Sequence, residues 1–224
     1  MTDPTIVLTH GAFHRGNCFD PLVVELERLG IDSRRPELPL TDLDEDVAAV
    51  TAVLDACDGP VTLLGHSYGG AVITVAGMHP AVERLVYLCA LAPDTGEGAS
   101  GGPIEIGTDF LAAMRVTESG EAYVDPALAP AVFYPDVDPA TARRWAQHLR
   151  PGNTGGSVIV SAAAWRERPA TYIVCAGDPI VLPSAQRAIA SRIGAEVREI
   201  DGDHSPMIAR PAELATMLAA AMGR

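Results

Sequence analysis

The sequence has no apolar run of about 18 residues, the length that a membrane-spanning helix requires. Its first four residues are polar and acidic, unlike the start of a secretion leader. Basic residues are scarce, since 16 Lys and Arg face 29 Asp and Glu and leave a formal net charge of −13. Such a surface repels phosphate backbones and anionic lipids. We therefore expect a cytoplasmic protein that binds neither nucleic acid nor membranes and prefers neutral or apolar small molecules.

Cysteine is rare too, and no two cysteines have the C-x-x-C spacing of a redox or zinc motif. Cys89 and Cys175 lie within apolar, strand-like stretches, so we interpret the cysteines as small buried residues in a reducing compartment. The sequence contains no cluster of metal-ligating residues and no Gly-rich phosphate loop with a Lys. We expect no metal and no cofactor. Nothing in the sequence indicates the oligomeric state.

The order of apolar segments predicts an α/β fold. The 224 residues suit one domain with a full core. Continuous apolar strands separated by helices are typical of a parallel sheet that is covered on both faces. The expected strands are 5–9, 31–35, 61–64, 85–90, 171–175 and 197–200. The expected helices begin at Asp20, at Leu43 and after the turn that follows 61–64, and two more cover 184–193 and 211–222.

A segment from about 93 to 169 interrupts this alternation. It is rich in Gly and Pro and contains only short helical pieces, near 110–115 and 141–149. Irregular insertions of this size between core strands are usually functional. We therefore expect a cap at about 93–169 over a core formed by 1–92 and 170–224, all within one domain.

The strongest chemical signal is the pattern G-x-S-x-G at Gly65–Gly69. An apolar strand precedes it and a helix with small residues follows it. This is the context of a nucleophile elbow, where a sharp strand-to-helix turn exposes a serine hydroxyl above the sheet. An ordinary Gly-rich turn with Ser67 as a helix cap explains this context less well. We predict that Ser67 is a nucleophile.

A second glycine-containing loop, His10–His14, follows the first strand. Gly11 allows the chain to turn there, so that the backbone amide of Ala12 points toward a substrate oxygen. The amide of Tyr68, directly after the nucleophile, is the expected second donor. The two amides form a predicted oxyanion hole, which stabilises negative charge in the transition state.

A serine nucleophile needs a general base and an acid that orients this base. Of the six histidines, His204 follows the last expected strand and completes the chain order Ser, Asp, His that accompanies such elbows. Asp178, in the turn after 171–175, is the first choice for the acid. Asp94 and Asp203 are the alternatives, although Asp203 adjoins His204 and is expected to point away from its Nδ1 atom.

Substrate-binding side chains are expected from the loop after the first strand and from the cap. Large aromatic side chains are the natural candidates, because they contribute much apolar contact area. Each of those in the cap has the alternative role of packing the core of the cap itself. The predicted substrate-binding residues are Phe13, His14, Phe133, Tyr134 and Trp145.

With these segments in place, the chain resembles the α/β-hydrolase superfamily over essentially its whole length. More narrowly, it resembles the branch of plant methylesterases, hydroxynitrile lyases and small bacterial esterase-like proteins. In that branch the acid lies shortly before a Leu-Pro pair, which favours Asp178 over Asp94. The resemblance implies an α/β-hydrolase fold and a serine esterase with the triad Ser67, His204 and Asp178. It is carried by Leu8–His14, Gly65–Gly70, Asp178–Pro183 and Gly202–His204.

Two positions differ from the hydroxynitrile lyases of that branch, which carry a Lys after the catalytic His and a Thr in the oxyanion loop. This chain has Ser205 and Gly11 at those positions, which disfavours cyanohydrin cleavage. We predict hydrolysis of carboxylic esters of small, neutral or apolar substrates through an acyl-enzyme on Ser67. The alternatives are lyase or cyclase chemistry in specialised metabolism, and a non-catalytic ligand-binding protein of the same fold.

Overall fold

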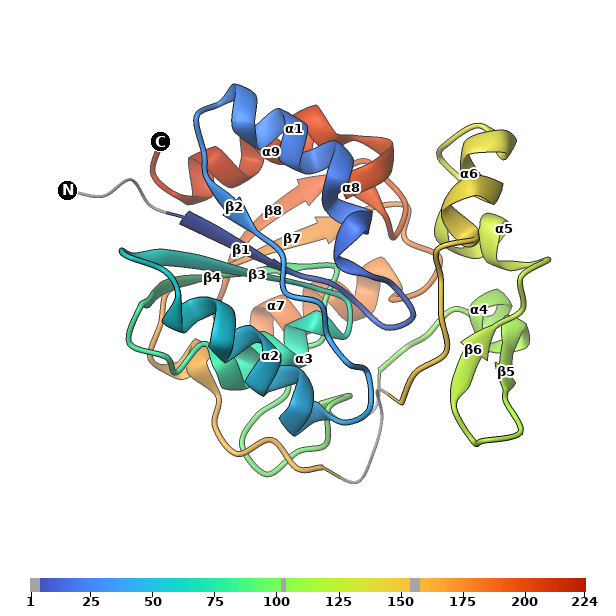
Figure 1. Cartoon of the computed structure of the whole chain (residues 1–224), viewed down its shortest axis with the longest axis horizontal. Helices are drawn as coiled ribbons and strands as arrows, with labels where there is room; N and C mark the ends of the chain where they lie inside the picture. Colours follow the sequence, from blue (N-terminus) through green and yellow to red (C-terminus); the bar gives the residue numbers. More distant parts are fainter. Residues whose placement is uncertain (1–4, 102–103, 154–157) are drawn as a thin grey trace.

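A six-stranded sheet forms the centre of the computed structural model, which describes residues 5–101, 104–153 and 158–224. The strands are β1 (Thr5–Thr9), β2 (Ser33–Arg34), β3 (Val61–His66), β4 (Val82–Leu88), β7 (Ala170–Cys175) and β8 (Glu196–Ile200). Their order is β2-β1-β3-β4-β7-β8, and all neighbours are parallel (Figure 1). The predicted α/β fold is confirmed.

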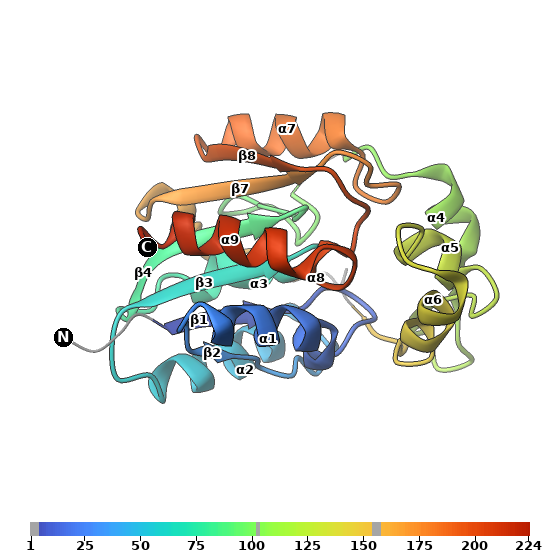
Figure 2. The same ribbon diagram turned by 90° about the horizontal axis from the view of Figure 1, so that it is seen from above.

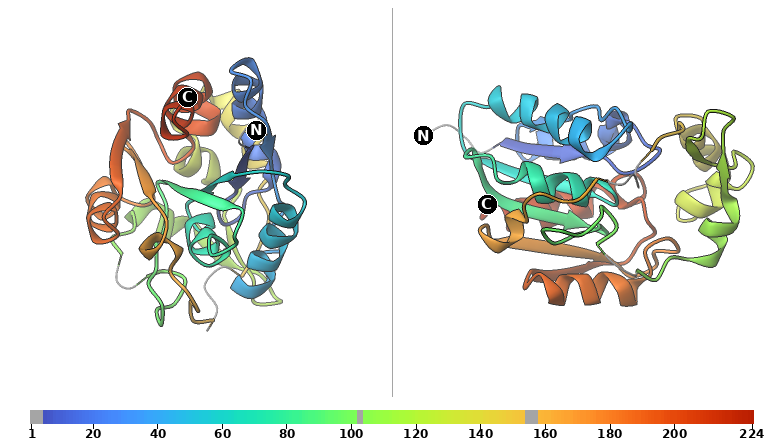
Figure 3. Two further views of the ribbon diagram at one scale, coloured as in Figure 1. Left: turned by 90° about the vertical axis from the view of Figure 1, so that its left-hand side faces the viewer. Right: turned by 90° about the horizontal axis from the view of Figure 1, so that it is seen from below.

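Helices cover both faces of this sheet. α1 (Asp20–Arg28), α8 (Pro206–Ala209) and α9 (Pro211–Ala221) lie on one face. α2 (Leu43–Asp55), α3 (Gly69–Ala76) and α7 (Pro183–Arg192) lie on the other (Figure 3, left). Side chains of a strand alternate between the faces, so Ile6 and Leu8 join the core beneath α1 and α9, whereas Val7 joins the core beneath α2 and α3.

Local sequence signals explain where several elements begin and end. Asp42 caps α2 by accepting a hydrogen bond from the Glu45 amide at 2.9 Å. A proline occupies the first turn of α1, α7 and α9, where its missing N–H and fixed φ are tolerated. The strand expected at 31–35 corresponds to β2, which is only two residues long. It lies at the edge of the sheet and is followed by Pro36, which has no amide to donate.

A smaller lobe stands at the carboxyl ends of the strands (Figure 2). All of its elements belong to the segment for which the sequence predicts a cap. The helical pieces expected near 110–115 and 141–149 correspond to the first and last of its helices. Its elements are α4 (Thr108–Ala113), β5 (Met114–Val116), β6 (Ala122–Val124), α5 (Ala129–Phe133) and α6 (Pro139–Ala146).

The hairpin of β5 and β6 and the helix α5 were not predicted. Each of these strands has three residues, too few to show an alternating pattern. The last part of the expected cap also behaves differently from the lobe. The short 3-10 turn Ala164–Arg166 packs against the end of α3, which belongs to the core of the sheet. No helix within the described ranges is long and apolar enough to cross a membrane.

Backbone segments from different elements meet at the turn after β3. A Cβ atom on Gly69 would lie 2.6 Å from the carbonyl oxygens of both Thr9 and His10, and one on Gly65 would lie 2.5 Å from the Gly69 carbonyl oxygen. Backbone oxygens cannot rotate away as side chains can. The glycines of the G-x-S-x-G motif therefore meet a packing requirement of the fold.

We expect Gly69→Ala to lower the free energy of unfolding by about 1–3 kcal/mol, because the added methyl group overpacks this contact. Gly98→Ala is the matched control, since a Cβ there meets no atom within 4 Å, and it should change stability by no more than about 0.5 kcal/mol. Urea unfolding of the two variants measures both values. Equal stability of the two would contradict the role given to Gly69.

Candidate active site

Ser67 lies between β3 and α3, in the turn predicted as a nucleophile elbow. Its φ of +54° is a left-handed conformation that residues other than glycine seldom adopt. Its amide donates to the Leu88 carbonyl at 3.1 Å, and its carbonyl accepts from the amides of Gly70 and Leu91 at 3.0 Å each. These bonds hold a strained residue in place, which is typical of functional sites.

The loop after β1 lies directly against this turn. A Cβ atom on Gly11 would be 2.8 Å from the Ser67 Cβ, so the two backbones approach as closely as a glycine permits. Phe13 in the same loop has a φ of +64°. Within the described ranges, the amides of Ala12 and Tyr68 have no hydrogen-bond partner, and neither has the Ser67 hydroxyl. The predicted oxyanion donors and the predicted nucleophile therefore lie on adjoining turns, and none of them is hydrogen-bonded to another described residue.

Two buried histidines fix the shape of this loop. His10 Nδ1 donates to the Gly11 carbonyl at 2.9 Å, and its Nε2 accepts from the Leu38 amide at 3.0 Å. His14 Nδ1 donates to the Ala12 carbonyl at 2.9 Å, and its Nε2 accepts from the Tyr134 hydroxyl at 3.0 Å. Burial lowers the pKa of His10 to about 3 and that of His14 to about 4. Both rings are therefore neutral near pH 7, as their donor and acceptor pairs require.

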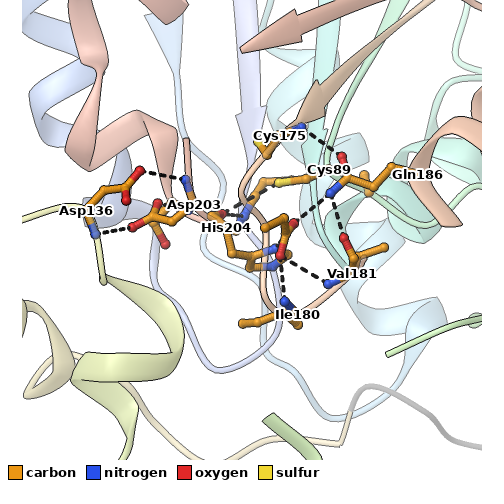
Figure 4. A network of polar contacts seen from close by, with 12 residues as sticks. Cys89, Asp136, Cys175, Ile180, Val181, Gln186, Asp203 and His204 are labelled. Atoms are coloured by element: carbon orange, nitrogen blue, oxygen red, sulfur yellow. Dashed lines mark hydrogen bonds and ion pairs between the residues drawn. The ribbon is translucent and has the colours of Figure 1, made fainter. Parts of the chain in front are cut away.

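His204 and Asp178 form a buried contact. His204 Nδ1 lies 2.7 Å from Asp178 Oδ2, and the side chains are only 1% and 0% exposed. The other oxygen, Asp178 Oδ1, accepts from the amides of Ile180 at 2.7 Å and Val181 at 3.2 Å (Figure 4). Amide donors at one oxygen and the imidazole at the other compensate a carboxylate charge that water cannot reach.

The two alternative acids are engaged elsewhere. Asp94 forms an ion pair with Arg166, whose Nε lies 2.8 Å from Asp94 Oδ1. Asp203 accepts hydrogen bonds from the Ser205 amide at 2.7 Å and from the Asp136 amide at 3.0 Å. Of the three candidate acids, Asp178 is the one whose carboxylate contacts His204.

The backbone of His204 is held from the elbow side. His66 Nε2 donates to the His204 carbonyl at 2.8 Å, and the Cys89 thiol approaches the same oxygen at 3.6 Å. His66, Cys89 and His204 also bring potential metal ligands within 4.8 Å of one another. Burial raises the pKa of the Cys89 thiol well above its ordinary value, and a neutral thiol is a poor metal ligand. The arrangement fits hydrogen bonding better than metal binding.

Aromatic rings from the loop and the lobe extend from this site. The Phe133 ring lies 5.0 Å from His14, 5.9 Å from Phe110 and 6.2 Å from His204, measured between centroids. Phe13 joins the group through Phe110 at 6.5 Å. We call Phe13, His14, Phe110, Phe133 and Tyr134 the aromatic cluster.

Trp145 takes a different position from the other predicted substrate-binding residues. It lies on α6, where its ring is 5.7 Å from that of His148, and it is partly buried against the same apolar core that contains Phe133. Phe13, His14, Phe133 and Tyr134 are all nearly fully buried within the aromatic cluster. Four of the five predicted substrate-binding residues thus come together near His204, whereas the ring of the fifth, Trp145, contacts that of His148.

Three polar residues of the site were not singled out in the sequence. Asp46 accepts from the Tyr68 hydroxyl and the Leu40 amide, both at 2.8 Å. Gln186 contacts Asp178, and Asp136 contacts Asp203 (Figure 4). Asp46 and Gln186 each carry a detectable signal, because each is a polar residue on the buried face of a predicted helix. Asp136 lies in an irregular stretch with no such signal.

Asp136 and Asp203 form two reciprocal hydrogen bonds, and we call them the aspartate pair. The Asp136 amide donates to Asp203 Oδ2 and the Asp203 amide donates to Asp136 Oδ2, each at 3.0 Å. This pair joins the lobe to the residue before His204. The Tyr134 hydroxyl joins the lobe to the oxyanion loop through His14. The lobe is therefore bonded to both loops that surround Ser67.

A model of the Alpha/beta hydrolase family matches residues 6–217, and the chain belongs to this family. It is 30% identical over 249 residues to the probable hydrolase R7 of a Phoma species, covering 100% of both proteins. It is 26% identical to Methylesterase 7 of Arabidopsis thaliana, over 95% of this chain and 94% of that protein. The crystal structure of a pyrethroid hydrolase from Sphingobium faniae is 26% identical with a TM-score of 0.82, over 98% of this chain and 97% of the other.

These similarities confirm the predicted α/β-hydrolase fold and the predicted kinship with plant methylesterases. The names of the relatives, hydrolase and esterase, agree with the prediction of an enzyme of the hydrolase class. The roles of individual residues stay predictions.

The bond between Tyr134 and His14 predicts a measurable loss of stability. Tyr134→Phe leaves the buried Nε2 of His14 without its donor, and we expect the free energy of unfolding to fall by about 1–3 kcal/mol. Tyr123→Phe is the control, because its hydroxyl has no hydrogen-bond partner in the described part of the chain. Chemical denaturation compares the two variants, and equal effects would count against the Tyr134–His14 bond.

The burial of the Asp203 carboxyl predicts that the free energy of unfolding depends on pH. Burial raises the pKa of Asp203 from the ordinary 3.8 to about 6, although the amide donors of Asp136 and Ser205 oppose this shift. A carboxyl with a raised folded-state pKa contributes stability that is full below its unfolded pKa and is lost as the pH rises through the folded one. The unfolding free energy of wild type minus that of Asp203→Asn should thus decrease between about pH 4 and pH 7, by about 1.4 kcal/mol per pKa unit of difference.

Urea unfolding of both proteins across this pH range measures the difference. Asp201→Asn, on the exposed side of the same loop, controls for the loss of one negative charge. A difference between wild type and Asp203→Asn that stays constant with pH would refute the assignment to Asp203.

Proposed function

We propose that this protein is a serine esterase that cleaves small, neutral or apolar carboxylic esters through an acyl-enzyme on Ser67. The observation that carries the proposal is the buried 2.7 Å contact between His204 Nδ1 and Asp178 Oδ2 beside the elbow. Through this contact Asp178 selects the tautomer in which Nδ1 carries the proton and Nε2 is free to act as a base.

In the proposed reaction, His204 Nε2 removes the proton of the Ser67 hydroxyl as Oγ attacks the ester carbonyl carbon. The amides of Ala12 and Tyr68 donate to the oxyanion, and such donors contribute about 2.7–4 kcal/mol each. His204 then gives its proton to the leaving alcohol, and water hydrolyses the acyl-enzyme through the same groups. The hydrogen bond between the base and the nucleophile is often long when no substrate is bound. A Ser67 hydroxyl without a hydrogen-bond partner among the described residues is therefore compatible with proton transfer to His204.

The aromatic cluster supports an apolar substrate. It lies next to His204, and a substrate group that packs against such rings gains from apolar contact and finds little compensation for a charge. His14 belongs to this cluster, but burial lowers its pKa to about 4, so it brings no positive charge near neutral pH. The formal net charge of −13 further disfavours polyanionic substrates. The names methylesterase and pyrethroid hydrolase among the relatives agree with ester cleavage.

The proposal is tested with p-nitrophenyl acetate, butyrate and octanoate as substrates for wild type and Ser67→Ala. We expect wild type to turn over and the variant to lose about 10⁴-fold or more in rate. The preferred chain length then reports the size of the acyl site. A fluorophosphonate should label wild type and leave Ser67→Ala unlabelled.

Thermal unfolding of Ser67→Ala serves as the control for folding, since alanine must adopt the same left-handed backbone as serine. If both proteins hydrolyse the esters at the same slow rate, Ser67 is not an ester nucleophile. The lyase and ligand-binding alternatives would then take precedence.

A further inference from the structure

Gln186 on α7 is completely buried next to the proposed catalytic acid. Its side-chain amide makes three hydrogen bonds. Nε2 donates to Asp178 Oδ2 at 2.8 Å and to the Val181 carbonyl at 2.7 Å. Oε1 accepts from the Cys175 amide at 2.9 Å (Figure 4). One side chain thus joins the end of β7, the acid and the loop after the acid.

These partners permit a single orientation of the Gln186 amide. Its oxygen faces a backbone N–H, and its nitrogen faces a carboxylate and a carbonyl. Rotating the amide by 180° would oppose donor to donor and acceptor to acceptor. The group is therefore locked without help from any mobile or exposed residue.

Asp178 Oδ2 is the oxygen that both Gln186 and His204 approach, at 2.8 and 2.7 Å. The amides of Ile180 and Val181 occupy the opposite oxygen. With Oδ1 anchored by the backbone, the remaining freedom of the carboxylate is rotation that would move Oδ2 away from the imidazole. Gln186 opposes this rotation.

We propose that Gln186 is a positioning residue of the catalytic acid. It fixes the Asp178 carboxylate so that Oδ2 meets His204 Nδ1, and it compensates part of the buried charge with a neutral donor. A neutral donor leaves the full negative charge of the acid to stabilise the imidazolium that forms during the reaction. This inference rests on the proposed esterase function, because it assigns Gln186 a part in the same proton transfer.

Gln186→Met tests the loss of both donors with a side chain of similar length. Within the described residues, Gln186 bonds to Asp178, Val181 and Cys175 and to no member of the aromatic cluster. We therefore expect kcat to fall by about 10- to 100-fold, the range for losing one hydrogen bond to a charged group, while KM stays unchanged. Rates are normalised to folded protein by circular dichroism. Ser184→Ala is the matched control on the same helix, because Ser184 bonds to Glu105 and not to the acid, and it should retain the wild-type kcat.

Gln186→Glu is the isosteric variant that separates positioning from mere packing. A protonated Glu can donate to Asp178 as the amide does, so activity at low pH should exceed that of Gln186→Met. Two adjacent carboxylates cannot both ionise without strong repulsion. The variant should therefore gain an alkaline limb in its kcat/KM profile, at the pH where the shared proton leaves, whereas wild type should show none there.

Wild-type kcat in folded Gln186→Met, or a Gln186→Glu profile without the added limb, would overturn the inference. A second measurement does not depend on ester turnover. The downfield proton resonance of His204 Nδ1 should be present in wild type and lost in Gln186→Met. If wild type shows no Ser67-dependent hydrolysis, the esterase proposal fails, while a resonance that is unchanged in Gln186→Met refutes the role of Gln186 separately.

Discussion

A carboxylate with no access to water is the constraint around which the site is organised. Burying the charge of Asp178 requires donors on both oxygens, and they come from three directions: its own loop, α7 and the turn that carries His204. These segments are distant in sequence and converge because parallel strands end at one edge of the sheet. The hydrogen bond between His204 and Asp178 therefore also helps to compensate a charge that is buried in the core.

The lobe contributes hydrogen bonds to the loops that surround Ser67. It meets the oxyanion loop through Tyr134 and His14, and it meets the His204 turn through the aspartate pair. The Arg150 amide, after α6, also donates to the Phe13 carbonyl at 2.8 Å. Displacing the lobe would therefore disturb both the loop that carries Ala12 and the turn that carries His204.

The sequence revealed the features that depend on local pattern and chain order. Gly65–Gly69 between an apolar strand and a helix predicts the elbow, and the position of His204 after the last strand follows from the same topology. The hairpin β5–β6 was not predicted, because strands of three residues are too short to show an alternation of apolar and polar side chains. Asp136 escaped because its partner, Asp203, is 67 positions away and the stretch around it is irregular. Contacts between side chains and distant backbone amides leave no trace in a single sequence.

The close approach of Gly11 to the elbow limits how this protein can evolve. A Cβ at position 11 would lie 2.8 Å from the Ser67 Cβ and 3.0 Å from His66 Nδ1. The threonine that hydroxynitrile lyases of the resembling branch carry in this loop would therefore not fit the present backbone. The nearest of these atoms belongs to Ser67 and a third is the His66 backbone oxygen at 3.2 Å, so a side chain at position 11 requires the backbone of the loop or of the elbow to shift. The backbone itself, more than any neighbouring side chain, restricts which residues position 11 accepts.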